Sequence, residues 1–140
     1  DLVINYREED FVQAALAATE GRGVDVILDM VCGDYVNRNL ACLAAEGRLV
    51  QIALMGGTHS DIDFARLMAM RHTITGSTLR PRSVEEKGSI AAALRDKVLP
   101  LLAQAKVKPI IHRVFPLAEA RAAHALMESG AHIGKIVLTI

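Results

Sequence analysis

Residues 47–57 read Gly-Arg-Leu-Val-Gln-Ile-Ala-Leu-Met-Gly-Gly, a short apolar run with glycines at both ends. A run this short, and apolar on both faces, is typical of a buried strand in a parallel sheet. Helical patterns flank it on both sides, which predicts an α/β fold. Ligands of such sheets bind at the carboxyl ends of the strands. That end is Leu54–Gly57, where two glycines would let a flat ligand approach the backbone closely.

The composition fits an α/β domain with a core of Val, Ile, Leu and Ala. The chain has 140 residues, of which 51% are hydrophobic, and it has no Trp and a formal net charge of zero. A neutral chain gives no sign of nucleic-acid binding, and no apolar segment approaches the ~20 residues of a membrane span. The cysteines, Cys32 and Cys42, form neither a disulfide framework nor a metal-ligand pattern, which favours a reducing, cytoplasmic location.

Strand and helix patterns alternate along the whole chain. Strands are expected at residues 2–5, 24–31, 49–54, 73–79, 110–115 and 135–140. Helices are expected at residues 8–19, 35–44, 64–70, 84–104 with a break at Pro100, and 117–128. Asp63 and Ser83 are candidate N-caps, and Asp10 lies in a first helical turn, where a carboxylate is favourable.

Right-handed crossovers should bring four consecutive strand ends to one edge of the sheet. These ends are Tyr6, Met30–Gly33, Leu54–Gly57 and Ser77–Arg82. A site built from several such loops has the geometry of a nucleotide-binding crevice. The phosphate-binding pattern Gly-x-Gly-x-x-Gly does not occur between a strand and a helix, so the residues alone indicate part of an α/β domain that could bind a nucleotide.

Several stretches, in this order and spacing, resemble the zinc-free NADPH:quinone oxidoreductases of the medium-chain dehydrogenase/reductase superfamily, which include the zeta-crystallin-like reductases. The resemblance covers essentially the whole chain. The matching stretches are Ile4–Tyr6, Gly23–Asp29, Gly47–Val50, Leu54–Gly57, Gly76–Arg80 and Gly134–Leu138.

This resemblance implies an incomplete Rossmann-type, doubly wound parallel sheet that contains strands 3 to 6 of the family's nucleotide domain. Residues 1–80 would form a partial dinucleotide-binding domain, and residues 81–140 would return to the substrate domain. Strands 1 and 2, the glycine fingerprint and the substrate domain would belong to a preceding part of a longer protein. Leu2–Asn5 would then lack neighbours, and we expect a shifted strand, dimerisation or a rearrangement of residues 1–20 to close the gap.

The resemblance also implies where NADPH would bind in the intact protein, although we do not expect this chain alone to hold it. Tyr6 would contact the adenosine-side phosphates, residues 30–33 the adenine and ribose, and residues 54–56 the nicotinamide. The residues expected to bind the cofactor are Tyr6, Met30, Val31, Cys32, Gly33, Leu54, Met55, Gly56, Ser77, Thr78, Leu79, Ile133 and Lys135. Each of these positions is also compatible with an ordinary packing or turn role.

The implied activity is hydride transfer from NADPH to a quinone or related enone, with no catalytic residue and no metal ligand in this chain. One alternative is another enzyme of the superfamily, an enoyl reductase or a zinc alcohol dehydrogenase. Another is a non-catalytic binding or assembly module with the same fold. The family further implies a homodimer formed through Thr73–Leu79.

Overall fold

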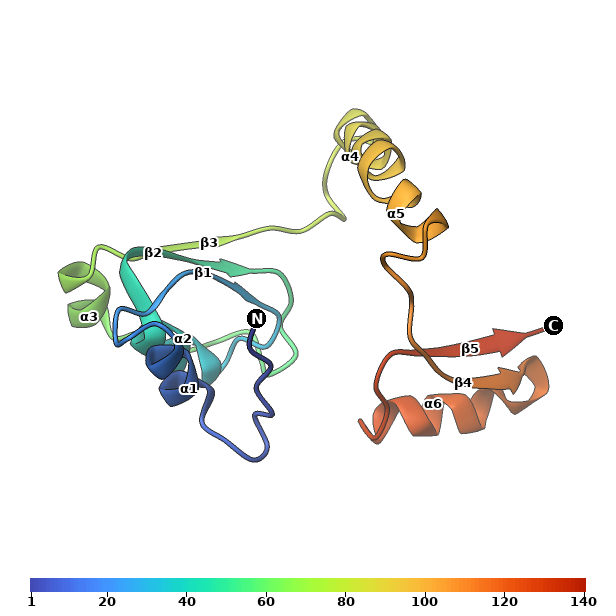
Figure 1. Ribbon diagram of the computed structural model, residues 1–140, viewed down its shortest axis with the longest axis horizontal. Helices are drawn as coiled ribbons and strands as arrows, with labels where there is room; N and C mark the ends of the chain where they lie inside the picture. Colours follow the sequence, from blue (N-terminus) through green and yellow to red (C-terminus); the bar gives the residue numbers. More distant parts are fainter. The chain divides into compact units, whose positions relative to one another are not determined.

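A computed structural model describes all residues, Asp1–Ile140, and divides the chain into two compact units, Asp1–Arg82 and Ser83–Ile140 (Figure 1). The first unit contains α1 (Phe11–Ala18), β1 (Val24–Asp29), α2 (Tyr35–Cys42), β2 (Leu43–Gln51), α3 (Phe64–Ala69) and β3 (Thr73–Gly76). The second contains α4 (Val84–Lys97), α5 (Leu99–Ala103), β4 (Ile111–Pro116), the 3-10 turn η1 (Leu117–Glu119), α6 (Ala120–Glu128) and β5 (Lys135–Thr139). The α/β fold class is thus confirmed.

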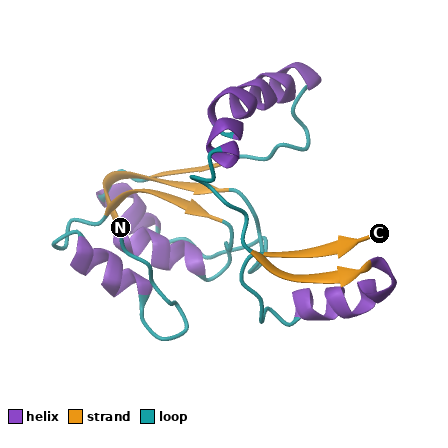
Figure 2. Cartoon of the chain, turned by 45° about the vertical axis from the view of Figure 1, so that its right-hand side comes forward, coloured by secondary structure: helices purple, strands orange, loops and turns teal.

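The sheet of the first unit is parallel throughout, in the order β1-β2-β3. Helices α1 and α2 lie on one face of it, as the two views show (Figures 1 and 2). The core lies between this face and α2, where Leu40, Leu43 and Leu49 are fully buried. On the other face of β1, Val26 and Leu28 are exposed, so α1 and α2 cover only one side of this strand.

The strand expected at Leu2–Asn5 does not form, and this prediction is wrong. Leu2 and Val3 are exposed, and no strand pairs with the outer edge of β1. Instead, the backbone N–H groups of Glu8 and Glu9 donate to the carbonyl of Asn5, which makes a turn. A strand is stable only when a neighbour satisfies its backbone, and no shifted strand provides that neighbour.

Two other boundaries differ from the expected ones for local reasons. Strand β2 begins at Leu43, before Gly47, because Leu43 already pairs with Val24 across an irregularity in the register. The long helix breaks at Val98, and Pro100 lies in the first turn of α5, where its missing N–H costs no helical hydrogen bond.

The expected helix caps are present. Asp63 accepts a hydrogen bond from the Arg66 N–H, and Ser83 and Glu86 form a reciprocal capping box at the start of α4. Asp10, expected in the first turn of a helix from residue 8, is instead the N-cap of α1, which begins at Phe11, and it accepts from the N–H groups of Val12 and Gln13. These backbone hydrogen bonds, with a smaller contribution from Arg38, hold the pKa of the Asp10 carboxyl below its usual value.

Replacing Asp10 with Ala should destabilise the protein at neutral pH and have little effect in strong acid. Because the folded-state pKa of Asp10 is lowered, the stabilisation is present above its ordinary pKa of about 3.8 and is lost as the pH falls through the folded-state pKa. Thermal unfolding of both proteins between pH 7 and pH 2 measures this. A difference in melting temperature that stays constant over the whole range would contradict it.

The second unit contains, besides α4 and α5, a parallel pair of strands, β4 and β5, packed on α6. Phe115 from β4 and Ala123 from α6 are its buried apolar residues. No helix of the chain has both the length and the apolar character that crossing a membrane requires.

Candidate nucleotide site

The three strands of the first sheet end at the same level, because Asp29, Gln51 and Gly76 are register partners. The loops that follow them therefore share the carboxyl edge, where ligands of parallel sheets bind. Two cavities open at this edge. The first is lined by the β1 and β2 loops together with side chains of α1 and α2, and the second lies between the β2 loop and the end of β3.

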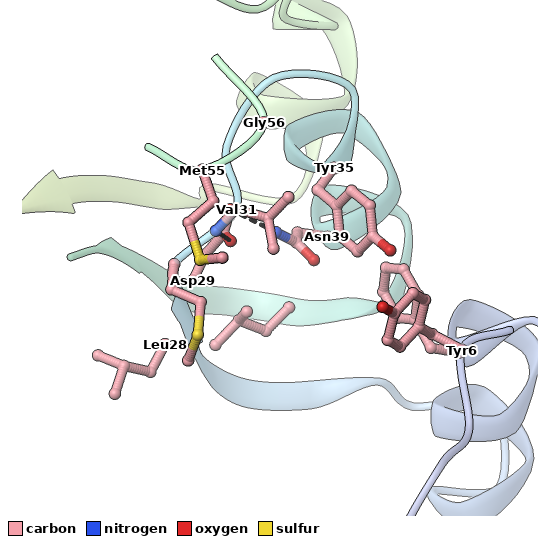
Figure 3. Close-up of a pocket in the computed structure, with 11 residues that line it drawn as sticks. Tyr6, Leu28, Asp29, Val31, Tyr35, Asn39, Met55 and Gly56 are labelled. Carbon is pink, nitrogen blue, oxygen red and sulfur yellow. Dashed lines mark hydrogen bonds between the residues drawn. The ribbon is translucent and has the colours of Figure 1, made fainter. Parts of the chain in front are cut away.

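The first cavity has a volume of about 580 Å³ and is lined mainly by apolar and aromatic side chains. Leu28 and Met55 lie on one side of it, and Tyr6 and Tyr35 lie on the other (Figure 3). Its lining residues are Tyr6, Phe11, Ile27, Leu28, Asp29, Met30, Val31, Tyr35, Asn39, Met55 and Gly56. An apolar cleft with a few polar groups is the usual form of a small-molecule site.

Stacked flat groups stiffen the helical side of this cavity. The rings of Phe11 and Tyr35 stack with centroids 5.4 Å apart, which joins α1 to α2. The Arg38 guanidinium lies 4.4 Å from the Phe11 ring centroid and forms an ion pair with Asp10. Stacking of this kind fixes the ring orientations, so the helical side of the cavity is preformed.

The second cavity has a volume of about 460 Å³ and exposes backbone as well as side chains. It is lined by Gln51, Ile52, Ala53, Leu54, Gly76, Ser77 and Thr78. The Ser77 N–H donates to the Gln51 carbonyl, so the chain leaving β3 follows the end of β2.

The β1 and β2 loops are joined by their backbones. The Met55 N–H donates to the Met30 carbonyl at 3.2 Å, and the Gly56 N–H donates to the Val31 carbonyl at 2.7 Å. Gly33 has φ +55°, and a Cβ placed there would lie 2.5 Å from the Gly56 carbonyl oxygen. Only glycine fits this contact, so the two loops form a single wall.

Hydrogen bonds from polar side chains near the strand ends hold these two loops in place. The buried Asp29 carboxylate accepts hydrogen bonds from the Val31 N–H and from the Asn39 side-chain amide (Figure 3). It also accepts one from the Cys32 N–H. The Gln51 amide donates to the carbonyls of Asp29 and Ala53. The Gln51 side chain therefore joins the end of β1 to the loop that follows β2.

The structure brings most of the expected cofactor-binding residues to this edge. Tyr6, Met30, Val31, Met55 and Gly56 line the first cavity, and Leu54, Ser77 and Thr78 line the second. Cys32 and Gly33 lie in the same loop, and Cys32 is buried in the core cluster.

Five expected residues line neither cavity: Cys32 and Gly33, which lie in the β1 loop, and Leu79, Ile133 and Lys135. Leu79 follows β3, is exposed and lines neither of them. Ile133 and Lys135 belong to the second unit, where they lie just before and at the start of β5.

Sequence reasoning missed ten residues that line the cavities: Phe11, Ile27, Leu28, Asp29, Tyr35, Asn39, Gln51, Ile52, Ala53 and Gly76. A signal existed for Asp29 and Gln51, because a carboxylate and an amide stand at the ends of otherwise apolar strands. Nothing in the sequence showed that the two are register partners.

The chain offers no ready zinc site. No group of three or more His, Cys, Asp or Glu side chains is arranged to hold a metal ion. Cys42 is buried, and burial raises the pKa of its thiol, which disfavours the thiolate that binds metals.

Comparisons with known proteins identify the family. The family described as "Zinc-binding dehydrogenase" matches residues 1–138. A highly reducing polyketide synthase of Dothideomycetidae sp. (strain 11243) is 31% identical over 143 residues, which covers 100% of this chain and 5% of the synthase.

Solved structures agree with this match. A mycobacterial quinone oxidoreductase superposes with a TM-score of 0.74 at 29% identity, over 100% of this chain and 43% of the other. The CurK enoyl reductase superposes with a TM-score of 0.67 at 28% identity, over 93% of this chain and 39% of the other. The chain thus spans less than half of these solved chains. It is a member of the zinc-binding dehydrogenase family, within the medium-chain dehydrogenase/reductase superfamily of NAD(P)-dependent oxidoreductases.

Proposed function

We propose that the chain forms part of the cofactor site, with places for both the adenosine and the nicotinamide end, in an NADPH-dependent reductase whose acceptor is a quinone or related enone. The observation that carries this proposal is the wall made by the β1 and β2 loops, with its contact between Gly33 and Gly56 and a cavity on each side. The first cavity beside this wall is lined mainly by apolar and aromatic side chains, which offer a flat ring a surface to lie against. The likeness to the quinone oxidoreductase supports this acceptor class.

A second candidate is reduction of an enoyl thioester. The curated relatives include highly reducing polyketide synthases, and the solved neighbours include the CurK and JamJ enoyl reductases. Quinones, enones and enoyl thioesters share one chemistry, because in each a carbonyl group activates a conjugated double bond toward hydride.

In either reaction NADPH would supply the hydride, and the protein would bind and orient the reactants. The aromatic cavity containing Tyr6 and Tyr35 would take the adenosine end. The second cavity, between Leu54 and Ser77, would take the nicotinamide end, with backbone groups of Ser77 and Thr78 beside the carboxamide. The apolar walls would exclude water from the reacting carbon.

The proposal is tested by NADPH oxidation in the full-length protein with three acceptors: a quinone, a simple enone and an enoyl thioester. Preference for the quinone or enone supports the first candidate, and preference for the thioester supports the second. If the protein oxidises NADPH with none of them, a non-catalytic binding or assembly module is the better description. NADH in place of NADPH measures the cofactor preference.

The chain of residues 1–140 alone should bind NADPH far more weakly than the full-length protein does. The chain contains no Gly-x-Gly-x-x-Gly turn, which in dinucleotide-binding folds cradles the pyrophosphate at a helix N-terminus. Calorimetric titration of both proteins measures the difference. Micromolar binding by the chain alone would contradict this expectation and show that the cavities are sufficient.

We also propose a homodimer through β3, the edge strand of the first sheet. All four of its residues are exposed, and an open edge can pair with a second copy. Light scattering of the full-length protein tests this, and a monomer would refute it.

A further inference from the structure

We propose that Asp29, Asn39 and Gln51 act as one positioning unit, which sets the position of the two loops relative to each other and thereby the placement of the cofactor beside them. The proposal rests on the proposed function, and it adds residues to which no role in that function has been assigned. None of the three needs to touch a reacting atom. They act through the loops, so they are positioning residues rather than catalytic ones.

The first half of the unit fixes the β1 loop. Asp29 is 5% exposed and Asn39 is 4% exposed. One carboxylate oxygen of Asp29 accepts from the Val31 N–H at 2.6 Å, and the other accepts from the Asn39 amide at 3.0 Å. The Cys32 N–H lies 3.2 Å from both oxygens. A buried carboxylate is tolerated only when such donors surround it, so the loop and α2 are held in one arrangement.

The second half of the unit fixes the β2 loop. The Gln51 amide nitrogen donates to the Asp29 carbonyl at 3.1 Å and to the Ala53 carbonyl at 2.6 Å. Gln51 interrupts the otherwise apolar run from Leu49 to Leu54. A partly buried amide there costs desolvation that an aliphatic side chain would not, and its two hydrogen bonds join the end of one strand to the loop of the next.

These contacts couple the loops through Asp29. Its carboxylate accepts hydrogen bonds from the N–H groups of Val31 and Cys32. Its carbonyl accepts hydrogen bonds from the Gln51 side-chain amide and the Ile52 N–H. A shift at Gln51 should therefore reach Val31, although no hydrogen bond joins these two residues. Because residues on both loops line the cavities, the same shift would change the position of a bound ring.

Replacing Gln51 with Met tests the coupling, because Met has a similar length and no donor. The control is Gln13→Met on the exposed face of α1, where the side chain has no hydrogen-bond partner. Amide hydrogen exchange of the full-length protein without cofactor is the measurement. We expect Gln51→Met to accelerate exchange in both residues 30–33 and residues 53–57, by about tenfold for the loss of a hydrogen bond of ordinary strength, and Gln13→Met to change neither. Faster exchange in only one loop, or in none, would overturn the coupling.

Steady-state kinetics of the same variants test the consequence for the cofactor. We expect Gln51→Met to raise the KM for NADPH about tenfold, to leave the KM for the acceptor nearly unchanged, and to increase the isotope effect on kcat with NADPH deuterated at the transferred position. Kinetic constants equal to those of the unsubstituted protein, together with loosened loops, would overturn the positioning role. If the unsubstituted protein neither binds nor oxidises NADPH, the proposed function fails and positioning fails with it. Hydrogen exchange reports on the loop coupling in either case, so the two failures are distinguishable.

Discussion

Gly33→Ala should lower the free energy of unfolding by about 2–5 kcal/mol and abolish tight cofactor binding. Two costs add together in this variant. The residue has φ +55°, which L-residues rarely adopt, and the new methyl group would lie 2.5 Å from the Gly56 carbonyl oxygen. That oxygen belongs to the backbone and cannot rotate away, so the β2 loop itself must move. Urea denaturation and NADPH titration of the full-length protein measure the two effects.

Gly21→Ala is the matched control for this prediction. Gly21 also has a positive φ, +81°, but a Cβ placed there would meet nothing within 4 Å. It should therefore show only the conformational cost, about 1–2 kcal/mol, and retain cofactor binding. Equal losses of stability in the two variants would mean that the contact between the loops contributes nothing.

Leu40→Ala should destabilise the protein by about 2–5 kcal/mol, the range observed for leucines in well-packed cores. Leu40 is completely buried and packs in the cluster that contains Val36, Leu43 and Leu49. Its carbonyl also accepts a hydrogen bond from the Arg66 guanidinium at 2.9 Å, which ties α2 to α3. This tie holds the backbone in place, so the cavity left by the substitution should not collapse fully.

The control for Leu40 is Leu2→Ala, because Leu2 is 59% exposed in the same unit. We expect a loss below about 1 kcal/mol for this surface substitution. Urea denaturation with a common slope for all variants gives both values. A Leu40→Ala variant as stable as Leu2→Ala would contradict the assignment of the core to the helical face of the sheet.

Sequence reasoning predicted the elements whose signals are local. The N-caps at Ser83 and Asp63 each depend on residues three positions apart, and both are present. The strand expected at Leu2–Asn5 had an equally good local composition, but it does not form. A strand also needs a partner, and pairing is a property of the whole sheet.

The candidate site likewise contains residues that the sequence indicated and residues that it did not. Glycines after an apolar strand marked the Leu54–Gly57 loop, because a glycine-rich strand end can be read directly from the sequence. The unit of Asp29, Asn39 and Gln51 could not be read, because it depends on the register of two parallel strands and on a helix residue ten positions after Asp29. Register follows from packing and not from any single segment.

The contact between Gly33 and the Gly56 carbonyl limits how this protein can be engineered. The obstacle is main chain, so no side-chain substitution at residue 56 should rescue a variant at residue 33. Insertions or deletions within residues 53–57 would move the Gly56 carbonyl and disturb its close contact with Gly33. A library designed to change cofactor binding should therefore keep the length of this loop and randomise the exposed side chains of Leu54 and Met55.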